Sequence, residues 1–457
     1  MKSRVCFAAL AAGVSAAMAQ TATPEFGAEL RGHALLPATT TVAPPRNAPP
    51  SLAVSGKYAG KPGERVDALG TLPGNSFLSD KAAPRATGRT LPMRGQPVQG
   101  FSGIKPAGGG AYWVIADNGF GSKANSSDAM LAMHRVRPDW KLGAVKLERT
   151  VFFSDPNRKL PFLIVNEGTK ERYLTGSDLD TESMQIVGDT VWLGDEFGPF
   201  LVSTDLRGRV TGVHATVVDG KPVRSPDHPA LSMPAVPGAV SFEARRSRGY
   251  EGMAASKDGR FLYPLLEGPL WQDTSDGKGW EIKEGREVLR ILEFDIAARA
   301  FTSRSWKYVL EANGNNIGDF NMIDANTALV IERDNGEGDP ADACSGAPQA
   351  NCQNVPAKFK RIYKIDLSQA DAGGVAKKVG YIDLMNIADP KGRAHRGAKN
   401  GRFTFPFVTI EDVDVVDSEH IIVANDNNYP YSMGRALGKQ DDNEFILLYV
   451  PELLKAR

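Results

Sequence analysis

Acidic side chains recur at matching places along this chain, and they are the side chains best suited to chemistry. Short strand-like segments begin with a polar or acidic residue before an apolar stretch, in residues 100–104, 181–187, 250–256, 319–324 and 410–416. The segments that follow them end in carboxylates or amides, in residues 113–119, 192–198, 263–269, 329–335 and 421–428. If the heads and tails of these segments meet, the acids form a single site.

Carboxylates gathered at one place favour bound cations, because uncompensated carboxylates repel one another. Calcium is the expected cofactor, as one or more ions, since it accepts about six to eight oxygen ligands in loose geometry. The candidate metal ligands are Asp117, Glu182, Asp195, Glu196, Glu251, Glu267, Glu332, Asp334, Glu411, Asp412 and Asp426. Neutral oxygens are available from Asn118, Asn335, Asn425 and Asn427. Zinc is disfavoured, because the histidines are scattered and form no H-x-x-x-H or H-x-H pair.

Each of these acids also has a purely structural interpretation. Asp and Asn at strand ends often do no more than form turns, by hydrogen-bonding to their own backbone. Glu gains little in turns, so more weight falls on Glu182, Glu251, Glu267, Glu332 and Glu411. The candidate catalytic residues are Glu182, Glu251, Glu332 and Glu411. The alternative for the glutamates is a role as hydrogen-bond partners of backbone amides between repeats.

Cations among the acids suggest how a substrate is held. Lys123 follows the segment ADNGFG, and Arg333 lies between Glu332 and Asp334. These two side chains are the candidate substrate-binding residues, because Lys and Arg grip anionic groups such as phosphate. Alternatively, they only neutralise the neighbouring carboxylates.

Short antiparallel strands are the elements that must position these residues. Turns rich in Gly, Asp and Asn join the paired segments, which is typical of β-hairpins. A third strand follows in each unit and a fourth in most, as in residues 141–153. Four antiparallel strands per unit, repeated around a ring, predict an all-β fold of the β-propeller class. A pair of two-sheet sandwiches is the alternative that the same strand signals allow.

Six blades of four antiparallel strands are predicted, with long inserted loops such as residues 221–248. Five blades are recognisable after residue 99, and a sixth is assigned to residues 52–97. The last unit stops at its third strand, so an N-terminal strand within residues 28–39 is expected to supply the fourth and close the ring. The predicted organisation is a signal peptide (1–19), a closing strand with a Pro-rich connector (20–51) and a propeller domain (52–457).

The first residues have the pattern of an export signal. Lys2 and Arg4 precede an apolar run that ends in Ala17-Met18-Ala19. This pattern predicts a cleaved signal peptide and a periplasmic or secreted protein. The run is shorter than the roughly 20 residues that a membrane span needs.

Cys344 and Cys352 lie in a loop rich in Gly, Pro, Asn and Gln. In an oxidising compartment a disulfide between them is expected, and a metal role is disfavoured because no His lies beside them. Such a short loop gains about 2–3 kcal/mol at most in the chain-entropy description. The bond is therefore expected to order the loop locally.

The charge balance limits the classes of partner. The chain has 54 basic and 54 acidic side chains, with a formal net charge of zero. Nucleic acids and anionic membranes both require a basic face, so neither is an expected partner. We expect a monomer without a membrane span that binds a small molecule, of anionic character.

Four segments resemble one known family. They are SGIKPAGGGAYWVIADNGFGSK, DTESMQIVGDTVWLGDEFGPFLVSTDLRGRV, YEGMAASKDGRFLYPLLEG and FTFPFVTIEDVDVVDSEHIIVANDNNYP. They resemble the phytase-like family, also described as "esterase-like activity of phytase", from about Phe101 to Tyr449. The resemblance implies a secreted or periplasmic β-propeller with metal-assisted hydrolytic activity on phosphate or other esters. It implies no residue roles beyond the matching acids.

The leading hypothesis is therefore an exported, calcium-dependent hydrolase that acts on phosphate esters. Calcium held by the acids neutralises a phosphoryl group and lowers the pKa of a bound water. A lactonase or aryl-esterase propeller is the enzymatic alternative. A non-enzymatic, calcium-stabilised binding propeller of the cell envelope is the alternative from another class.

Overall fold

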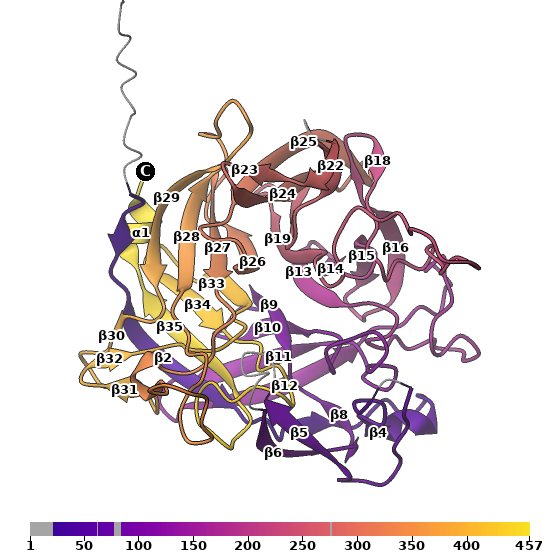
Figure 1. The fold of residues 1–457 in the computed structure, drawn as a ribbon, viewed down its shortest axis with the longest axis horizontal. Coiled ribbons are helices and arrows are strands. Elements are labelled where there is room, and N and C mark those ends of the chain that lie inside the picture. The colour runs from indigo at the N-terminus through magenta and orange to yellow at the C-terminus, as the bar shows by residue number, and fades with distance from the viewer. Residues whose placement is uncertain (1–21, 62, 77–83, 275–276) are drawn as a thin grey trace, which may run out of the picture.

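Four-stranded antiparallel sheets, set radially about one axis, make up most of the computed structural model (Figure 1). The structure describes residues 22–61, 63–76, 84–274 and 277–457. The predicted signal peptide, residues 1–19, lies outside the described residues. The all-β prediction is confirmed, since the described chain has a single five-residue α-helix, α1 (Pro451–Lys455).

Five such sheets follow one another along the described chain. The first has β9 (Phe101–Pro106), β10 (Tyr112–Ala116), β11 (Ala132–Asp139) and β12 (Ala144–Phe152); the second has β13 (Thr181–Val187), β14 (Thr190–Asp195), β15 (Phe200–Asp205) and β16 (Val210–Ala215). The third has β19 (Tyr250–Ala255), β20 (Phe261–Leu266), β24 (Arg286–Asp295) and β25 (Ala300–Val309); the fourth has β26 (Asn316–Met322), β27 (Thr327–Arg333), β28 (Lys360–Asp366) and β29 (Lys377–Asp383). The fifth has β33 (Asp412–Val415), β34 (His420–Ala424), β35 (Asn443–Tyr449) and β2 (Glu29–Leu36).

The innermost strands form a closed ring. β9 contacts β13, β13 contacts β19, β19 contacts β26, β26 contacts β33, and β33 returns to β9. Figure 1 shows these strands around the centre of the view, with the later strands of each sheet farther out. This is the arrangement of a β-propeller, in which the first strands of all sheets line one central channel.

The N-terminal strand closes this ring. β2 pairs antiparallel with β35, with Leu30 opposite Leu448 and Ala34 opposite Phe445. Its other edge meets β12 of the first sheet at Leu35. The first and last sheets are thereby joined through one strand from the start of the chain, as the sequence predicts.

The predicted sixth blade is not found among the described residues. Within residues 52–97 the strands form two-stranded ribbons, β4 (Val54–Ser55) with β7 (Met93–Arg94) and β5 (Leu72–Ser76) with β6 (Arg85–Leu91). The segment GKPGERVDALGT between β4 and β5 contains three glycines and one proline, which do not support a sheet interior.

The remaining elements are short. They are β1 (Glu25–Phe26), β3 (Thr41–Val42), η1 (Pro50–Ala53), β8 (Gln96–Pro97), β17 (Val217–Val218), β18 (Lys221–Pro222), β21 (Trp271–Thr274), β22 (Gly277–Trp280), β23 (Ile282–Lys283), η2 (Pro340–Asp342), β30 (Ile387–Ala388), β31 (Ala398–Lys399) and β32 (Arg402–Phe403). The predicted disulfide is confirmed: Cys344 and Cys352 are bonded, with their Cα atoms 5.0 Å apart.

Apolar side chains fill the spaces between neighbouring sheets. Ile115 and Met133 of the first sheet share one core with Leu193 and Val202 of the second, and all four are buried. Alternate residues of a strand face opposite sides, so a sheet packed on both sides carries apolar residues on both faces. This packing fixes the angle of each sheet and therefore the positions of its inner strand ends.

Polar side chains cross the central channel below its mouth. Lys105 Nζ lies 2.6 Å from Asp414 Oδ2 and donates to Asn321 Oδ1 at 2.5 Å. Gln185 Nε2 also donates to Asn321 Oδ1, at 2.8 Å. These side chains come from β9, β33, β26 and β13, so they tie together most of the inner ring.

Candidate functional site

A pocket of about 450 Å³ lies where the inner strands end, and acids dominate its lining. Its lining residues are Asp117, Asn118, Gly121, Asp180, Glu182, Glu196, Ser247, Arg248, Glu251, Glu267, Asn316, Arg333, Asn335, Val408, Thr409, Glu411, Asp426 and Asn428. All five sheets contribute residues at the head of the first strand or the tail of the second, and adjoining loops contribute the rest. The pocket is therefore the common place where the sequence predicts that acids meet.

Local irregularities in the strand pairing set the direction of two of the glutamate side chains. The register of β13 against β14 shifts between Thr181 and Ser183, and that of β19 against β20 shifts between Tyr250 and Gly252. The extra residue at these β-bulges is Glu182 in one sheet and Glu251 in the other. A bulge re-aims a side chain at the end of a ladder, which accounts for two acids entering the pocket from matching positions.

Two groups of carboxylates in the pocket are close enough to hold a metal ion. Asp180, Glu182 and Glu196 form one group, and Glu196, Glu251 and Glu267 form the other. Within each group, one oxygen from each residue lies within 4.8 Å of the others, and all of the residues are buried. The two groups share Glu196, so they form one continuous acidic surface.

Burial and mutual repulsion both disfavour charge on these acids. Burial, and then the charge of Asp180, raises the pKa of Glu182 well above its usual value. The pKa values of Glu196 and Glu251 are raised in the same way by burial and the charge of Glu267. Protons or cations must therefore compensate the carboxylates.

The same causes act on the other side of the pocket. Burial, and then the charge of Glu411, raises the pKa of Asp426 to about 8. The pKa of Asp117 is raised well above its usual value by burial and by Asp426. The pocket thus contains more acidic groups than its own cations neutralise.

Two arginines are the basic residues in the lining. Arg333 is 4% exposed, and its Nη2 lies 2.8 Å from Glu411 Oε1 and 3.9 Å from Glu251 Oε1. Arg248 Nη1 lies 2.5 Å from Glu267 Oε1, and its side chain is 31% exposed. Arg333 is therefore held inside the pocket, whereas Arg248 lies at its edge.

Glu332 lies outside the pocket, although the sequence analysis counts it among the catalytic and metal-binding candidates. Its Oε2 accepts hydrogen bonds from Tyr308 and Lys378, and its Oε1 accepts from Asn315 Nδ2 and the Glu311 amide. Strand alternation is the reason, because Glu332 and the neighbouring Arg333 face opposite sides of β27. Glu332 links neighbouring sheets instead.

Asp195, Asp412 and Asp334 also lie outside the pocket lining. Asp195 is fully buried and accepts hydrogen bonds from the backbone amides of Asp180 and Gly198. Asp412 accepts from the Gly103 amide. Both follow or precede a glutamate that does enter the pocket, so alternation again separates the two neighbours.

The third of these aspartates binds a segment more than twenty residues away in the chain. Asp334 Oδ2 accepts hydrogen bonds from the amides of Lys358 and Phe359, and its Oδ1 lies 2.9 Å from Lys360 Nζ. Its Oδ1 also accepts from the Gly336 amide at 3.3 Å, which is the local turn contact that Asp at a strand end often makes. Asn425 and Asn427, which the sequence analysis offers as neutral ligands, are likewise outside the lining.

Lys123, a predicted substrate-binding residue, is absent from the lining. Its Nζ donates a hydrogen bond to the Asp227 carbonyl oxygen at 3.1 Å and lies 5.4 Å from the centre of the Phe197 ring. Lys123 thus anchors the long loop that contains Asp227.

Asp180 and Arg248 are the main pocket residues that the sequence analysis does not single out. Asp180 precedes Glu182 by two positions, so strand alternation could have revealed that they share a face. Arg248 lies just before Glu251, but nothing in its spacing distinguishes it from the other arginines of that loop. Asn316, Thr409 and Asn428 come from three separate loops or strand ends and carry no sequence signal.

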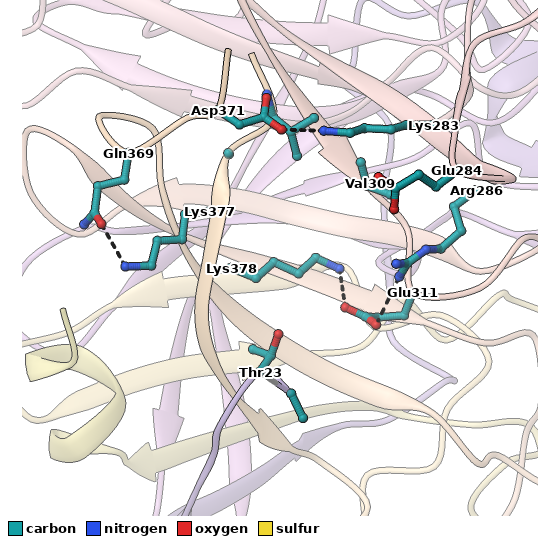
Figure 2. A pocket seen from close by; sticks show the side chains of 13 residues that line it. Thr23, Lys283, Glu284, Arg286, Val309, Glu311, Gln369, Asp371, Lys377 and Lys378 are labelled. Atoms are coloured by element: carbon teal, nitrogen blue, oxygen red, sulfur yellow. Dashed lines mark hydrogen bonds and ion pairs between the residues drawn. The ribbon is translucent and has the colours of Figure 1, made fainter. Parts of the chain in front are cut away.

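A larger pocket, of about 550 Å³, lies beside the outer strands β25 and β29. Figure 2 shows contacts between several of its charged side chains. Lys283 contacts Asp371, and both Arg286 and Lys378 contact Glu311. Among the described residues, neither metal-capable group of acids lies there. The smaller central pocket is therefore the candidate site.

Residues 96–429 match the phytase-like family, described as esterase-like activity of phytase. The match covers more than half of the chain and includes acids of both metal-capable groups. This protein belongs to the phytase-like family. The resemblance found in the sequence is thereby confirmed, and the central pocket lies within the region that defines this phytase-like protein.

One curated relative is an uncharacterized secreted protein of Arthroderma benhamiae, 28% identical over 141 residues. The alignment covers 26% of this phytase-like chain and 24% of the relative, so most of the relative lies outside the similarity. In the part of the chain that the structure describes, no helix is long and apolar enough to cross a membrane.

Solved structures give weak similarities. A luciferin-regenerating enzyme is 10% identical with a TM-score of 0.33 and covers 88% of this chain and 96% of its own. A periplasmic gluconolactonase of Pseudomonas aeruginosa is 11% identical with a TM-score of 0.31, covering 83% and 99%. An exo-1,5-alpha-L-arabinanase from a bovine ruminal metagenomic library is 8% identical with a TM-score of 0.34, covering 77% and 92%. At these scores, no activity is transferred from them.

Proposed function

We propose that this phytase-like protein is an exported, calcium-dependent hydrolase that cleaves esters of small molecules in the central pocket, with phosphate esters as the leading class. The observation that carries the proposal is the charge of the lining. Its acids are Asp117, Asp180, Glu182, Glu196, Glu251, Glu267, Glu411 and Asp426. Its cations are Arg248 and Arg333. Such an excess of buried carboxylates requires bound cations to remain ionised.

Calcium fits this donor set. The lining contains carboxylates, the amides of Asn118, Asn316, Asn335 and Asn428, and hydroxyls, but neither His nor Cys. Oxygen donors of mixed charge suit calcium, whereas nitrogen and sulfur donors suit zinc and related metals. When bound, calcium supplies positive charge at the reacting ester and makes a water molecule more acidic.

Three glutamates keep the roles that the sequence analysis suggests, in a narrower form. Glu182 and Glu251 belong to the two metal-capable groups of carboxylates. Glu411 belongs to neither group, and it is fixed at both oxygens, since Oε1 accepts from Arg333 and Oε2 accepts from the Ser102 hydroxyl at 3.1 Å. We assign Glu411 the role of accepting the proton of the attacking water.

The substrate is a small molecule with an anionic group near the arginines. A volume of about 450 Å³ suits a small ligand. Arg248, which is 31% exposed at the pocket edge, is available to a phosphoryl oxygen at small cost. Nothing in this proposal requires a second protein chain, a nucleic acid or a membrane.

A lactone or aryl ester is the second candidate substrate, and one observation favours it. Arg333 is already paired with Glu411 and Glu251 inside the pocket, and Lys123 is bonded to a loop outside it. The cations expected to grip phosphate are therefore largely occupied, and a neutral ester needs fewer of them.

Export is part of the proposal. The pattern of residues 1–19, the disulfide between Cys344 and Cys352 and the relative named as secreted all support a periplasmic or extracellular location.

A substrate panel with and without calcium tests the proposal. The mature protein is stripped with a chelator, assayed with p-nitrophenyl phosphate, phytate, p-nitrophenyl acetate and a small lactone, and assayed again after calcium is restored. We expect activity on at least one ester that is lost on stripping and recovered with calcium. A melting temperature that rises with calcium, without turnover of any ester, would overturn the enzymatic proposal in favour of a binding propeller.

A further inference from the structure

The two metal-capable groups share one carboxylate, which makes the pocket a candidate for a two-ion centre. Glu196 belongs to both groups, with Asp180 and Glu182 on one side and Glu251 and Glu267 on the other. Its backbone amide donates to the Asp180 carbonyl oxygen, and its Oε1 accepts from the Gly249 amide at 3.0 Å. Glu196 is thus held between the two groups. Paired ions bridged in this way are common in sites that cleave esters of phosphate.

Each group contains an oxygen that lacks a hydrogen-bond partner. Asp180 Oδ1 and Glu251 Oε1 are buried without one, and the two residues are 2% and 4% exposed. A buried carboxylate oxygen that is left unpaired is costly, so such atoms are rare unless something binds them. Glu251 Oε1 lies 3.9 Å from Arg333 Nη2, which is an ion pair but too long for a hydrogen bond. An oxygen without a hydrogen bond on each side of Glu196 points to one cation on each side.

The two sides differ in the cations that they already contact. Among the described residues, Asp180, Glu182 and Glu196 form no ion pair with Lys or Arg, so this group can be called the open group. In the other group, Glu267 pairs with Arg248 at 2.5 Å, and Glu251 lies 3.9 Å from Arg333. This second group can be called the guarded group. An ion that enters the guarded group lies next to arginine charge, whereas in the open group only the shared Glu196 is near an arginine.

Of the two arginines beside the guarded group, Arg248 is the one that can move. Its side chain is 31% exposed and its only ion pair is with Glu267, in the part of the chain described here. Arg333 is 4% exposed and is also bonded to Glu411, so it remains in place. Displacing Arg248 toward solvent frees an oxygen of the buried Glu267, and the entering cation then replaces the arginine as the partner of that carboxylate.

We propose that the pocket binds two calcium ions in order, the first in the open group and the second in the guarded group, with Glu196 shared and Arg248 weakening the second site. The proposal rests on the proposed function, because it describes the metal centre of the same pocket. It adds the number of ions, the order in which they bind and the residue that makes the second site weaker than the first.

Metal titration of the stripped mature protein tests this directly, without an activity assay. Calcium binding is measured by calorimetry, and terbium luminescence serves as a second readout of the same oxygen sites. We expect two equivalents whose dissociation constants differ by about tenfold or more, since a nearby positive charge opposes the second ion. Glu182→Gln removes the tight site, and Glu267→Gln removes the weak site alone.

The decisive variant is Arg248→Gln. We expect it to tighten the weak site by about tenfold while changing the tight site little. Arg245→Gln is the matched control, because Arg245 is 36% exposed, pairs with Glu287 at 2.8 Å and does not line the pocket. Arg245→Gln should leave both dissociation constants unchanged.

The possible failures are distinguishable. A single equivalent of metal, two equal sites, or a weak site unaffected by Arg248→Gln in a variant with native circular dichroism overturns the two-ion order. Calcium-dependent hydrolysis still stands in each of these cases. No binding of calcium or terbium, together with ester hydrolysis that chelators leave intact, overturns the proposed function as well.

Discussion

Glu182 and Glu332 are both buried glutamates near the end of an inner blade strand, yet they have opposite surroundings. Glu182 lines the pocket beside other carboxylates, and its pKa is raised. Glu332 is surrounded by donors, the hydroxyl of Tyr308, the ammonium of Lys378 and two nitrogens. Position along the chain therefore does not determine a glutamate's role; the face of the strand does.

Replacing each of these glutamates by glutamine distinguishes a residue that acts in the pocket from one that supports the fold. Glu182→Gln removes a metal-ligand charge and should lower calcium-dependent activity at least about 100-fold, with little loss of stability in the stripped protein. Glu332→Gln should cost about 2 kcal/mol of unfolding free energy, because it weakens buried hydrogen bonds to a charged group. Activity of folded Glu332→Gln should stay within a few-fold of the natural protein. Equal losses of activity in both variants would contradict this assignment.

Lys123 gives a second prediction at this scale. Because its Nζ bonds to the Asp227 carbonyl oxygen outside the pocket, Lys123→Met should leave kcat and KM for any accepted ester nearly unchanged. The expected stability change is below about 1.5 kcal/mol, the net worth of one hydrogen bond. A large rise in KM for phosphate esters alone would return Lys123 to the substrate-binding residues.

At the scale of elements, the ring depends on β2, which comes from the opposite end of the chain from β35. Ala34 is fully buried and lies opposite Phe445 in the antiparallel ladder. The Leu35 amide bonds to the Gly143 carbonyl oxygen on the other side, so the Ala34 amide faces β35. Both edges of β2 therefore form hydrogen bonds with neighbouring segments.

A proline in β2 should weaken the strand pairing that closes the ring. Ala34→Pro removes a ladder hydrogen bond in an interior strand and should cost at least about 3 kcal/mol of unfolding free energy, measured by denaturant titration. Ala300→Pro is the control, since Ala300 is the exposed first residue of the outer strand β25, where proline is tolerated. A smaller loss for Ala34→Pro than for Ala300→Pro would contradict the importance of the closure.

At the scale of the whole molecule, zero net charge conceals an uneven distribution of charge. Eight acids and two arginines line the central pocket. Burial raises the pKa of Asp426 in this lining to about 8, and that of Asp195, outside the lining, to about 7. An acid whose pKa is raised on folding stabilises the protein below its unfolded pKa of about 4. That stability is lost as the pH rises through the folded value.

The metal-free protein should therefore be more stable in mild acid. Between pH 8 and pH 5 its melting temperature should rise, by about 5 °C or more, because protons neutralise the pocket. With millimolar calcium the trend should flatten or reverse, since calcium binds the ionised acids and stabilises the folded state in proportion to its affinity. Differential scanning calorimetry with chelator or with calcium measures both trends. Identical pH profiles in the two conditions would contradict a metal centre in the pocket.

Much of this architecture can be predicted from the sequence. Hairpin turns are local, as at Asp324 and Asp417, whose side chains accept hydrogen bonds from the backbone of their own turns. The recurrence of acids at strand ends is also visible in the sequence, because repeated units carry their functional positions with them. The prediction of a sixth blade is wrong for the described residues, because turn signals alone do not distinguish a ribbon from a sheet.

The sequence by itself determined the kind of unit, its repetition and the residues that reach the inner strand ends, since strand period and turn chemistry are local properties. Only the tertiary structure decided which acid of each neighbouring pair enters the pocket. Glu196 enters and Asp195 does not, and Glu411 enters and Asp412 does not. The physical reason is that register and bulges set the orientation of a strand end, and they depend on the partner strand. The sharing of Glu196 and the pairing of Arg248 with Glu267 likewise join segments that are distant in the chain.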